Sequence, residues 1–219
     1  MRVVVVGAGE HGQVVADVLL SSRRQGSEWE PVGFVDDNPA LTGCKLLGLP
    51  VLGRVESLGL FPHDGVVVAI GDNDTRRSVF SLLEQRGERF VIARHPSAII
   101  AVDVEIGPGT MICAGVIVNP GTTIGSGVIL NTGCSIDHHN RIGDHVHVAP
   151  GVHTGGTVTV GAGSLVGIGA TVMPGRTIGA NSVVGAAALV QQDIADATVV
   201  VGVPARPVRK NEWLTSPHA

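Results

Sequence analysis

Histidines gather in one stretch of the chain, residues 136–153, which reads IDHHNRIGDHVHVAPGVH and holds five of the nine histidines. Imidazole exchanges a proton near neutral pH, so it suits general-base catalysis, and its nitrogens also bind metal ions. A carboxylate beside such a base would orient the ring. Asp137 precedes His138 directly, but adjacency along the chain does not establish that the two side chains meet.

A second chemical motif lies near the N-terminus. Gly7, Gly9 and Gly12 match the pattern G-x-G-x-x-G, after the apolar run 3–6 and before a helical pattern. Glycines allow a phosphate to approach the backbone, and the N–H groups of a helix N-terminus face the anion. We therefore expect a nucleotide-binding turn with His11 in contact with the ligand. A plain strand-to-helix connection is the alternative.

Acidic residues follow the second predicted strand, residues 31–35. Asp36 falls about where an acidic residue would meet a ribose or uridine hydroxyl, and Asp37 is its neighbour. Further strands at 65–70 and 90–93 and a helix at 75–86 complete the pattern. We predict a small Rossmann-like α/β domain over residues 1–95, which binds a nucleotide-linked ligand at the carboxyl ends of its strands.

The chain beyond residue 95 repeats with a period of six. Every sixth position from 100 to 190 is Ile, Leu or Val, with Thr154 as the exception. Short strands separated by turns explain this period, whereas helix and plain strand periods do not. Because Ile-Gly recurs with a longer beat of three hexapeptides, we predict a parallel β-helix with three strands per coil over residues 96–200. A C-terminal tail follows at 201–219.

The repeat also separates the histidines. Successive hexapeptides lie on different faces of a triangular coil, so His139 diverges from His145, and His147 from His153. A single metal site is therefore disfavoured, and we expect none. A zinc site assembled between chains stays as a distant alternative.

Composition and charge exclude several classes of function. A formal net charge of −4 gives no reason to expect binding to nucleic acid or to an anionic membrane. The apolar run at the N-terminus is too short for a membrane span or a signal peptide. Three cysteines without metal-ligand spacing favour a reducing compartment. We expect a cytoplasmic protein without membrane insertion.

The hexapeptides and the late Gly-Val-Pro-Ala segment at 202–205 resemble those of the left-handed β-helix acyltransferases. The order of the two domains resembles the sugar acetyltransferases of bacterial glycan biosynthesis. That group includes N-acetyltransferases of nucleotide-linked 4-amino sugars and sialic acid O-acetyltransferases. The resemblance implies a left-handed coil and a homotrimer with acetyl-coenzyme A between neighbouring β-helices. It further implies an N-acetyltransferase of a nucleotide-linked amino sugar, with a sugar O-acetyltransferase as the alternative and a zinc carbonic-anhydrase-like protein as a more distant one.

The same resemblance implies residue roles. The segment 136–139 matches the catalytic segment of the amino-sugar N-acetyltransferases, which makes His138 the general base. His139 stands where that family has an acidic residue. The carboxylate partner therefore stays open between Asp137, Asp144 and a residue of an adjoining chain.

Positions of the resemblance that hold the cofactor follow the histidine stretch. His147 matches the second histidine of the family, and Gly156 matches a glycine whose amide faces the thioester carbonyl. Ile168 is the third expected cofactor contact. Gly156 lies in the irregular segment 154–157, where the aliphatic repeat is broken.

Overall fold

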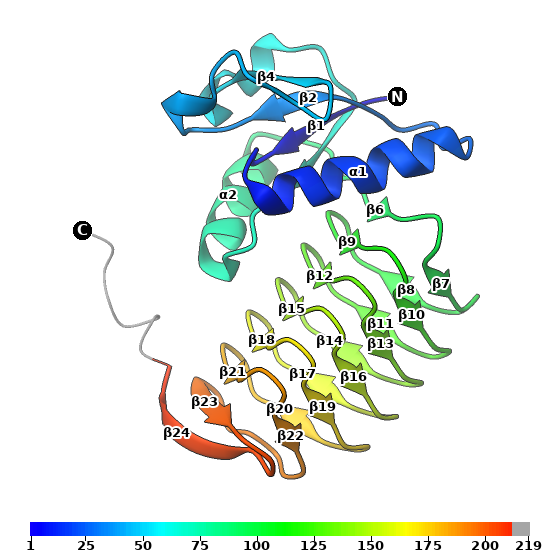
Figure 1. Ribbon diagram of the computed structural model, residues 1–219, viewed down its shortest axis with the longest axis vertical. Helices are drawn as coiled ribbons and strands as arrows, with labels where there is room; N and C mark the ends of the chain where they lie inside the picture. Colours follow the sequence, from blue (N-terminus) through cyan, green and yellow to red (C-terminus); the bar gives the residue numbers. More distant parts are fainter. Residues whose placement is uncertain (212–219) are drawn as a thin grey trace.

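The computed structural model describes residues 1–211 and contains a small α/β domain stacked on one end of a long β-helix (Figure 1). The predicted fold class, an α/β domain followed by a left-handed parallel β-helix, is confirmed. Of the predicted tail, residues 212–219 lie outside the described part of the chain.

The N-terminal domain is built around a sheet with strand order β3-β4-β2-β1-β5, in which β3 pairs antiparallel with β4 and the other pairs are parallel. The interior strand β1 (Arg2–Val6) is buried on both faces along its run of valines. Val3 and Val5 pack with helix α1 (Glu10–Arg24), whereas Val4 and Val6 pack with helix α2 (Asn73–Gln85). The remaining elements are β2 (Glu30–Val35), η1 (Pro39–Leu41), β3 (Lys45–Leu46), β4 (Leu49–Gly53), η2 (Val55–Leu60) and β5 (Gly65–Val68).

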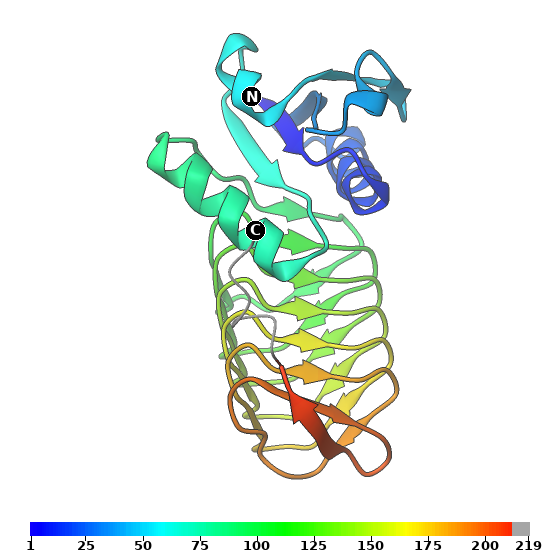
Figure 2. The same ribbon diagram turned by 90° about the vertical axis from the view of Figure 1, so that its left-hand side faces the viewer.

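The β-helix has three sheets, each running along one face of a triangular prism (Figure 2). The six-stranded sheet holds β7 (Ile99–Ile100), β10 (Ile117–Val118), β13 (Ser135–Ile136), β16 (His153–Thr154), β19 (Thr171–Val172) and β22 (Leu189–Val190). The five-stranded sheet holds β8 (Glu105–Ile106), β11 (Thr123–Ile124), β14 (Arg141–Ile142), β17 (Thr159–Val160) and β20 (Thr177–Ile178). The eight-stranded sheet holds β6 (Ala93–Arg94), β9 (Met111–Ile112), β12 (Ile129–Leu130), β15 (His147–Val148), β18 (Leu165–Val166), β21 (Val183–Val184), β23 (Thr198–Val201) and β24 (Arg206–Lys210).

Each two-residue strand turns one side chain inward and one outward. From Ile112 to Val190 the second residue of each strand is the inward one, and apart from Thr154 these residues are aliphatic and buried in one continuous core. Parallel pairing joins each strand to the one a full coil later, such as Val118 to Ile136. The period of six therefore follows from the need to supply one inward aliphatic side chain per face.

The two domains share a core where they meet. The outward side chains of Met111 and Ile129 are fully buried because they pack with the residues of α1 and its sheet. The segment expected as a fourth strand of the α/β domain divides here. Phe90 forms a single bridge to Val66, and β6 instead pairs with β9 of the β-helix. The first coil thus finds a hydrogen-bonding partner in the chain that enters it.

Candidate functional site

His138 lies in the turn from β13 to β14, at the corner between the six- and five-stranded sheets. Its ring is exposed and rests against the backbone of Gly156, one coil further on. A Cβ atom at position 156 would come within 2.4 Å of Cε1 of His138. Glycine is therefore required there if the ring is to keep its position. His138 and Gly156, which were expected to have separate roles, thus lie against each other.

The turn that carries His138 is fixed from below by a buried amide. Asn140 is fully buried, and its Nδ2 donates to the carbonyl oxygens of Asp137 (2.5 Å) and Gly155 (3.0 Å). Its Oδ1 accepts the backbone N–H of Val158 at 3.1 Å. A buried amide with satisfied donors and acceptors holds its surroundings rigidly. This residue thus ties the His138 turn to the next coil.

Thr154, the exception to the aliphatic repeat, also supports this turn. Its side chain points inward and is buried, and its Oγ1 accepts the backbone N–H of Asp137 at 3.3 Å. The irregular position is therefore part of the scaffold of the site. The hydroxyl supplies an acceptor that an aliphatic residue would lack.

Neither acidic residue near His138 in the sequence contacts its ring in the described part of the chain. Oδ1 of Asp137 accepts from Nδ2 of Asn119 at 2.9 Å and from the backbone N–H of His138 at 2.7 Å. These two hydrogen bonds, with that from Asn119 the stronger cause, lower the pKa of the Asp137 carboxyl. Asp144 accepts the backbone N–H of Ser126 at 2.7 Å. The ring of His138 instead meets that of the following residue, with 3.1 Å between the Nδ1 atoms of His138 and His139.

A second cluster lies on the eight-stranded sheet, where His147 projects outward from β15. Nδ2 of Asn131 lies 3.2 Å from Nε2 of His147, while Oδ1 of the same amide accepts the backbone N–H of Thr132 at 2.8 Å. Because the amide oxygen is already occupied, its NH2 group donates to Nε2. His147 is thus held with its proton on Nδ1. His11 of the glycine turn faces it, with ring centroids 6.3 Å apart.

Both rings of this cluster stay neutral near pH 7. Burial, with a smaller contribution from the charge of Arg76, lowers the pKa of His11 to about 4 and that of His147 to about 4. Arg76 itself is fully buried at the joint between the domains, and burial lowers its pKa to about 10. Its five N–H groups all find acceptors, namely the carbonyl oxygens of Gly127, Ile70, Gly71 and His145 and Oδ1 of Asn73.

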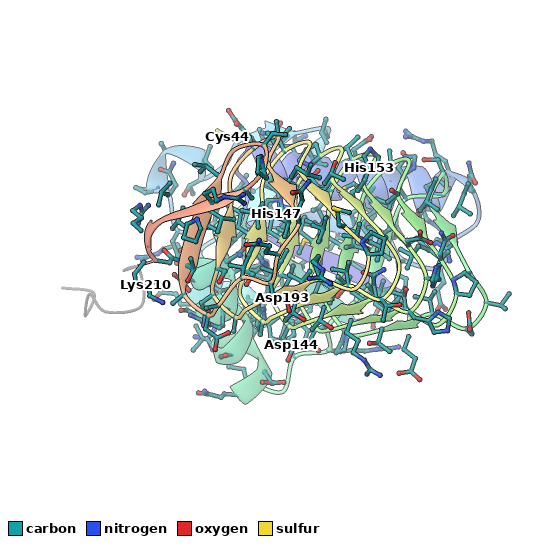
Figure 3. The ribbon with its side chains drawn as sticks, turned by 90° about the horizontal axis from the view of Figure 1, so that it is seen from below. Cys44, Asp144, His147, His153, Asp193 and Lys210 are labelled. Carbon is teal, nitrogen blue, oxygen red and sulfur yellow. The ribbon has the colours of Figure 1, made fainter. Side chains whose placement is uncertain are left out.

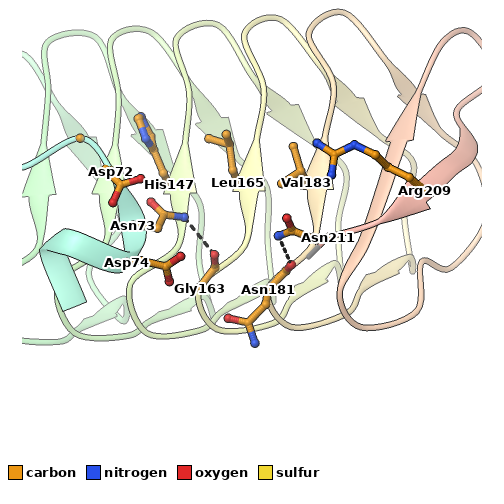
Figure 4. Close-up of a pocket in the computed structure, with 11 residues that line it drawn as sticks. Asp72, Asn73, Asp74, His147, Gly163, Leu165, Asn181, Val183, Arg209 and Asn211 are labelled. Atoms are coloured by element: carbon orange, nitrogen blue, oxygen red, sulfur yellow. Dashed lines mark hydrogen bonds between the residues drawn. The ribbon is translucent and has the colours of Figure 1, made fainter. Parts of the chain in front are cut away.

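A groove of about 310 Å³ starts at His147 and runs along the outward side chains of the next two coils (Figure 4). Leu165 and Val183 form its apolar floor, and Arg209 of β24 lies at its far end. The loop from β5 to α2 forms the near rim, where Nδ2 of Asn73 donates to the carbonyl oxygen of Gly163 at 3.0 Å. The groove thus connects the α/β domain with the C-terminal strand.

The glycine turn has the close approaches that its motif predicts. Gly7 has a φ of 102°, in the left-handed region, and a Cβ at Gly12 would lie 2.1 Å from the carbonyl oxygen of Gly7. Gly9 is the N-cap of α1 and supplies no side-chain hydrogen bond. The first N–H groups of the helix therefore have no side-chain acceptor within their own cap and face the end of the sheet.

Asp36 and Asp37 take different positions next to this turn. Oδ2 of Asp36 accepts the backbone N–H of Ala8 at 2.7 Å, which joins the carboxyl ends of β1 and β2. Asp37 turns the other way, accepts the N–H of Val55 at 3.1 Å and lies 3.6 Å from the guanidinium of Arg54. Asp36 is therefore the carboxylate that lies against the glycine turn.

The residues expected to act together form two groups on opposite sides of one chain. His138, His139 and Gly156 lie at the corner opposite the eight-stranded sheet, which carries His147. His153 belongs to the six-stranded sheet, and Asp144, His147 and His153 project from different parts of the prism (Figure 3). Ile168 lies at a third place, in an exposed turn after β18. Within residues 1–211 no three His, Cys, Asp or Glu side chains are arranged to hold a metal ion.

The sequence did not indicate four residues that support the site: Arg76, Asn119, Asn131 and Asn140. Only Asn140 had a signal, because it is a large polar residue in a column that from position 98 to 188 otherwise holds Ala, Val, Thr, Cys and Ser, with Arg176 as the one other exception. The others are polar residues at outward or helical positions, where polar side chains are ordinary.

Residues 2–83 match the family described as the PglD N-terminal domain. A solved structure of a histidine-to-alanine variant of GDP-perosamine N-acetyltransferase from Caulobacter crescentus, in complex with CoA and GDP-perosamine, is 34% identical, covers 96% of this chain and 98% of that chain, and has a TM-score of 0.89. The acetyltransferase domain of PglB from Neisseria gonorrhoeae FA1090 is 32% identical, with 94% and 99% covered and a TM-score of 0.87. WeeI from Acinetobacter baumannii AYE is 28% identical, with 95% and 100% covered and a TM-score of 0.84. A comparison with curated proteins found no match. No helix among residues 1–211 is long and apolar enough to cross a membrane.

Proposed function

The chain belongs to the family of hexapeptide-repeat sugar acetyltransferases, and from this membership we propose that it transfers the acetyl group of acetyl-coenzyme A to the amine of a nucleotide-linked amino sugar. The observation that carries the proposal is the similarity over nearly the full length to GDP-perosamine N-acetyltransferase, seen with CoA and GDP-perosamine. A shared fold alone would not carry an activity. Here the similarity extends over both domains, and Asn140 and Thr154 hold the turn that carries His138 in place.

In the proposed reaction His138 is the general base. The sugar amine attacks the thioester carbonyl as Nε2 of His138 takes up its proton, the C–S bond breaks, and the proton passes to the departing thiolate. Nδ1 of His138 is engaged by His139, so Nε2 is the nitrogen left to face the substrate. The backbone N–H of Gly156 would donate to the carbonyl oxygen as negative charge develops on it.

The α/β domain would hold the nucleotide. Phosphate groups would lie against the glycine turn and the N-terminus of α1, and Asp36 would meet a sugar hydroxyl of the nucleoside. Asp36 already accepts the N–H of Ala8 through Oδ2, which fixes the distance between its carboxylate and the turn. Binding energy from the nucleotide would then position the amine, since orientation contributes several kcal/mol to such transfers.

The groove that begins at His147 supports a position for acetyl-coenzyme A. Its apolar floor of Leu165 and Val183 suits the pantetheine arm, and Arg209 at the far end suits a phosphate. His147 would lie at the thioester end, as a neutral ring that does not compete for the proton of the amine. The exposed Ile168 would contact the cofactor from the next corner of the prism.

The opposite positions of His138 and His147 lead us to propose a homotrimer with shared sites. One chain cannot bring both residues to the same thioester, whereas neighbouring β-helices packed side by side can. The first coils support such packing, because Ile99, Val102 and Ile117 are exposed apolar residues near one face of the prism. We further propose a cytoplasmic location, where acetyl-coenzyme A and nucleotide sugars are both available.

Thiol release from acetyl-coenzyme A tests the proposed activity. The full-length protein is incubated with UDP-, GDP- and dTDP-linked 4-amino sugars and, in parallel, with sialic acid. Release with an amino sugar only is expected, and release with sialic acid only would identify an O-acetyltransferase instead. His138→Ala should lower kcat about 10²–10⁴-fold at nearly unchanged affinity for acetyl-coenzyme A. Full turnover by that variant would refute the assignment of the base.

Mixed oligomers test the shared site. His138→Ala and His147→Ala chains are each expected to be nearly inactive alone. Coexpression at equal amounts should recover about one quarter of the wild-type sites, because a trimer with both chain types contains one site with both histidines intact. Recovery no greater than the sum of the two separate activities would show that both histidines act within one chain or that His147 has no role.

A further inference from the structure

The two histidines of the catalytic turn form a hydrogen-bonded pair through like nitrogens. Nδ1 of His138 lies 3.1 Å from Nδ1 of His139, and the rings stand nearly perpendicular, at 80°. A neutral imidazole carries one N–H, so such a pair is bonded only if one Nδ1 is protonated and the other is not. In the reaction proposed above, Nε2 of His138 must be free to accept a proton. His138 is therefore the donor, and His139 accepts at Nδ1 and carries its own proton on Nε2.

The backbone of His139 takes a conformation that glycine adopts more readily. Its φ is 57°, and glycine fills most of the equivalent turn positions, such as Gly115, Gly121 and Gly133. A side chain in this left-handed conformation costs roughly 1–2 kcal/mol compared with glycine. Thr157, Asn181 and Ala187 adopt the same conformation, so the role of His139 is argued from the contacts of its ring.

The turn one coil earlier leaves room for this ring. A Cβ at Gly121, one coil earlier, would approach Cδ2 of His139 to 2.7 Å, so the absence of a side chain there leaves room for the imidazole. His145 has the same backbone conformation, with a φ of 56°, but its ring packs edge-on against Phe80, at 5.1 Å between centroids. This packing against Phe80 explains why a side chain is present at position 145. The ring of His139 is exposed, and its hydrogen bond goes to the proposed base.

The nearest carboxylate is committed elsewhere. Oδ1 of Asp137 accepts from Asn119 and from the backbone N–H of His138, and the hydrogen-bond partner of Nδ1 of the His138 ring is an imidazole and not this carboxylate. A neutral imidazole differs from a carboxylate in one chemical respect that matters here. It can take up a whole proton and then carry the positive charge itself.

We propose that His139 is the proton-sharing partner of His138. As Nε2 of His138 takes the proton of the amine, the proton on its Nδ1 moves to Nδ1 of His139, which then carries the positive charge. When the C–S bond breaks, Nε2–H of His138 protonates the thiolate and the Nδ1 proton returns from His139. Both rings end as they began, and the amine proton has become the thiol proton. This role rests on the proposed function. His139 is then a positioning and proton-holding residue, which acts through its hydrogen bond to His138 and does not itself contact the substrate.

Removal of the ring tests this role without loss of the fold. His139→Gly deletes the imidazole and relieves the left-handed backbone, so its Tm should equal or exceed that of the wild type. Its kcat should nonetheless fall at least about tenfold at unchanged KM for acetyl-coenzyme A. Imidazole added to the buffer should restore part of the lost rate, because the vacated position is exposed. A kcat within twofold of the wild type would overturn the proposal.

Two further variants separate proton transfer from simple orientation. His139→Asn can accept the Nδ1–H of His138 through its amide oxygen but cannot carry a proton, so its kcat should stay well below that of the wild type. Wild-type kcat in His139→Asn would show that orientation suffices and would refute the proton-holding role. Ala197→Gly relieves the same backbone conformation (φ 50°) at the far end of the β-helix and serves as the control with unchanged kcat.

Nitrogen NMR of 15N-histidine-labelled protein tests the pair independently of any substrate. The proposal requires a proton on Nδ1 of His138 and none on Nδ1 of His139 in the neutral state. Observation of Nε2–H on both rings would refute the pair even if the enzyme proves active. Conversely, failure of every amino sugar as acceptor would refute the proposed function. The observed tautomers would still show whether His138 and His139 are hydrogen-bonded through their Nδ1 atoms.

Discussion

Acidification should loosen the joint between the two domains, because His11 and His147 are partly buried there as neutral rings beside the cationic Arg76. Burial lowers the pKa of each from 6.5 to about 4. Between pH 4 and pH 6.5 the unfolded chain binds more protons than the folded one. The contribution of the two neutral rings to the free energy of unfolding is therefore fully present above pH 6.5 and is lost as the pH falls toward 4. From pH 7 to pH 5, each such shift corresponds to about 2 kcal/mol of unfolding free energy. Because each ring keeps some solvent contact, we expect a loss between about 2 and 4 kcal/mol for the pair.

Urea unfolding at pH 7 and pH 5, at one fixed protein concentration, measures this loss. Carboxyl groups elsewhere also titrate, so the comparison that matters is between variants. His147→Gln removes one titrating ring from the joint and should reduce the pH dependence by about 2 kcal/mol. His153→Gln removes an exposed histidine from another face and is the matched control. An equal pH dependence in wild type and His147→Gln would refute the assignment of a buried, neutral His147.

Three further changes test other parts of the structure. Gly156→Ala would bring a Cβ within 2.4 Å of the His138 ring. In steady-state assays kcat should therefore fall about 10- to 100-fold, with a nearly unchanged Tm. A kcat within twofold of the wild type would contradict this packing. Arg76→Met leaves several buried carbonyl oxygens at the domain joint without a donor, so the free energy of unfolding measured with urea should fall by about 3–5 kcal/mol. A decrease below about 1 kcal/mol would show that water replaces the guanidinium. Asp36→Ala removes the acceptor of the Ala8 N–H and should raise KM for the nucleotide sugar about tenfold at constant KM for acetyl-coenzyme A; equal changes in both constants would count against a nucleotide-specific role.

Periodicity made the fold readable from sequence. The six-residue beat indicates short strands that share a single core, and the recurrence of Ile-Gly after every three hexapeptides indicates three faces. The α/β domain was readable for a related reason, since valine runs that end at glycine and aspartate are typical of buried parallel strands with a ligand-binding edge. The strand expected at 90–93 was divided between the domains, because short terminal strands pair with whichever sheet edge lies near, and this depends on tertiary contacts.

The site was readable only in part. The match to a motif indicated His138 and Gly156, and the structure brings this pair into contact. The orientation of the Asp137 carboxylate could not be read from sequence, because it depends on Asn119, a full coil away. Arg76 was equally hidden, since a single arginine on a helix is ordinary and only its burial between two domains makes it notable. Interactions between distant segments leave little trace in a single sequence.

The fate of a labelled acetyl group tests the proposed acetyl transfer most directly. Acetyl-coenzyme A carrying a 13C-labelled acetyl carbonyl is mixed with the protein and GDP-perosamine or another nucleotide-linked 4-amino sugar, and the product is followed by NMR. We predict an amide carbonyl signal on the sugar with wild type and its near absence with His138→Ala. An ester signal, or an equal amide signal from both proteins, would refute N-acetyl transfer with His138 as the base.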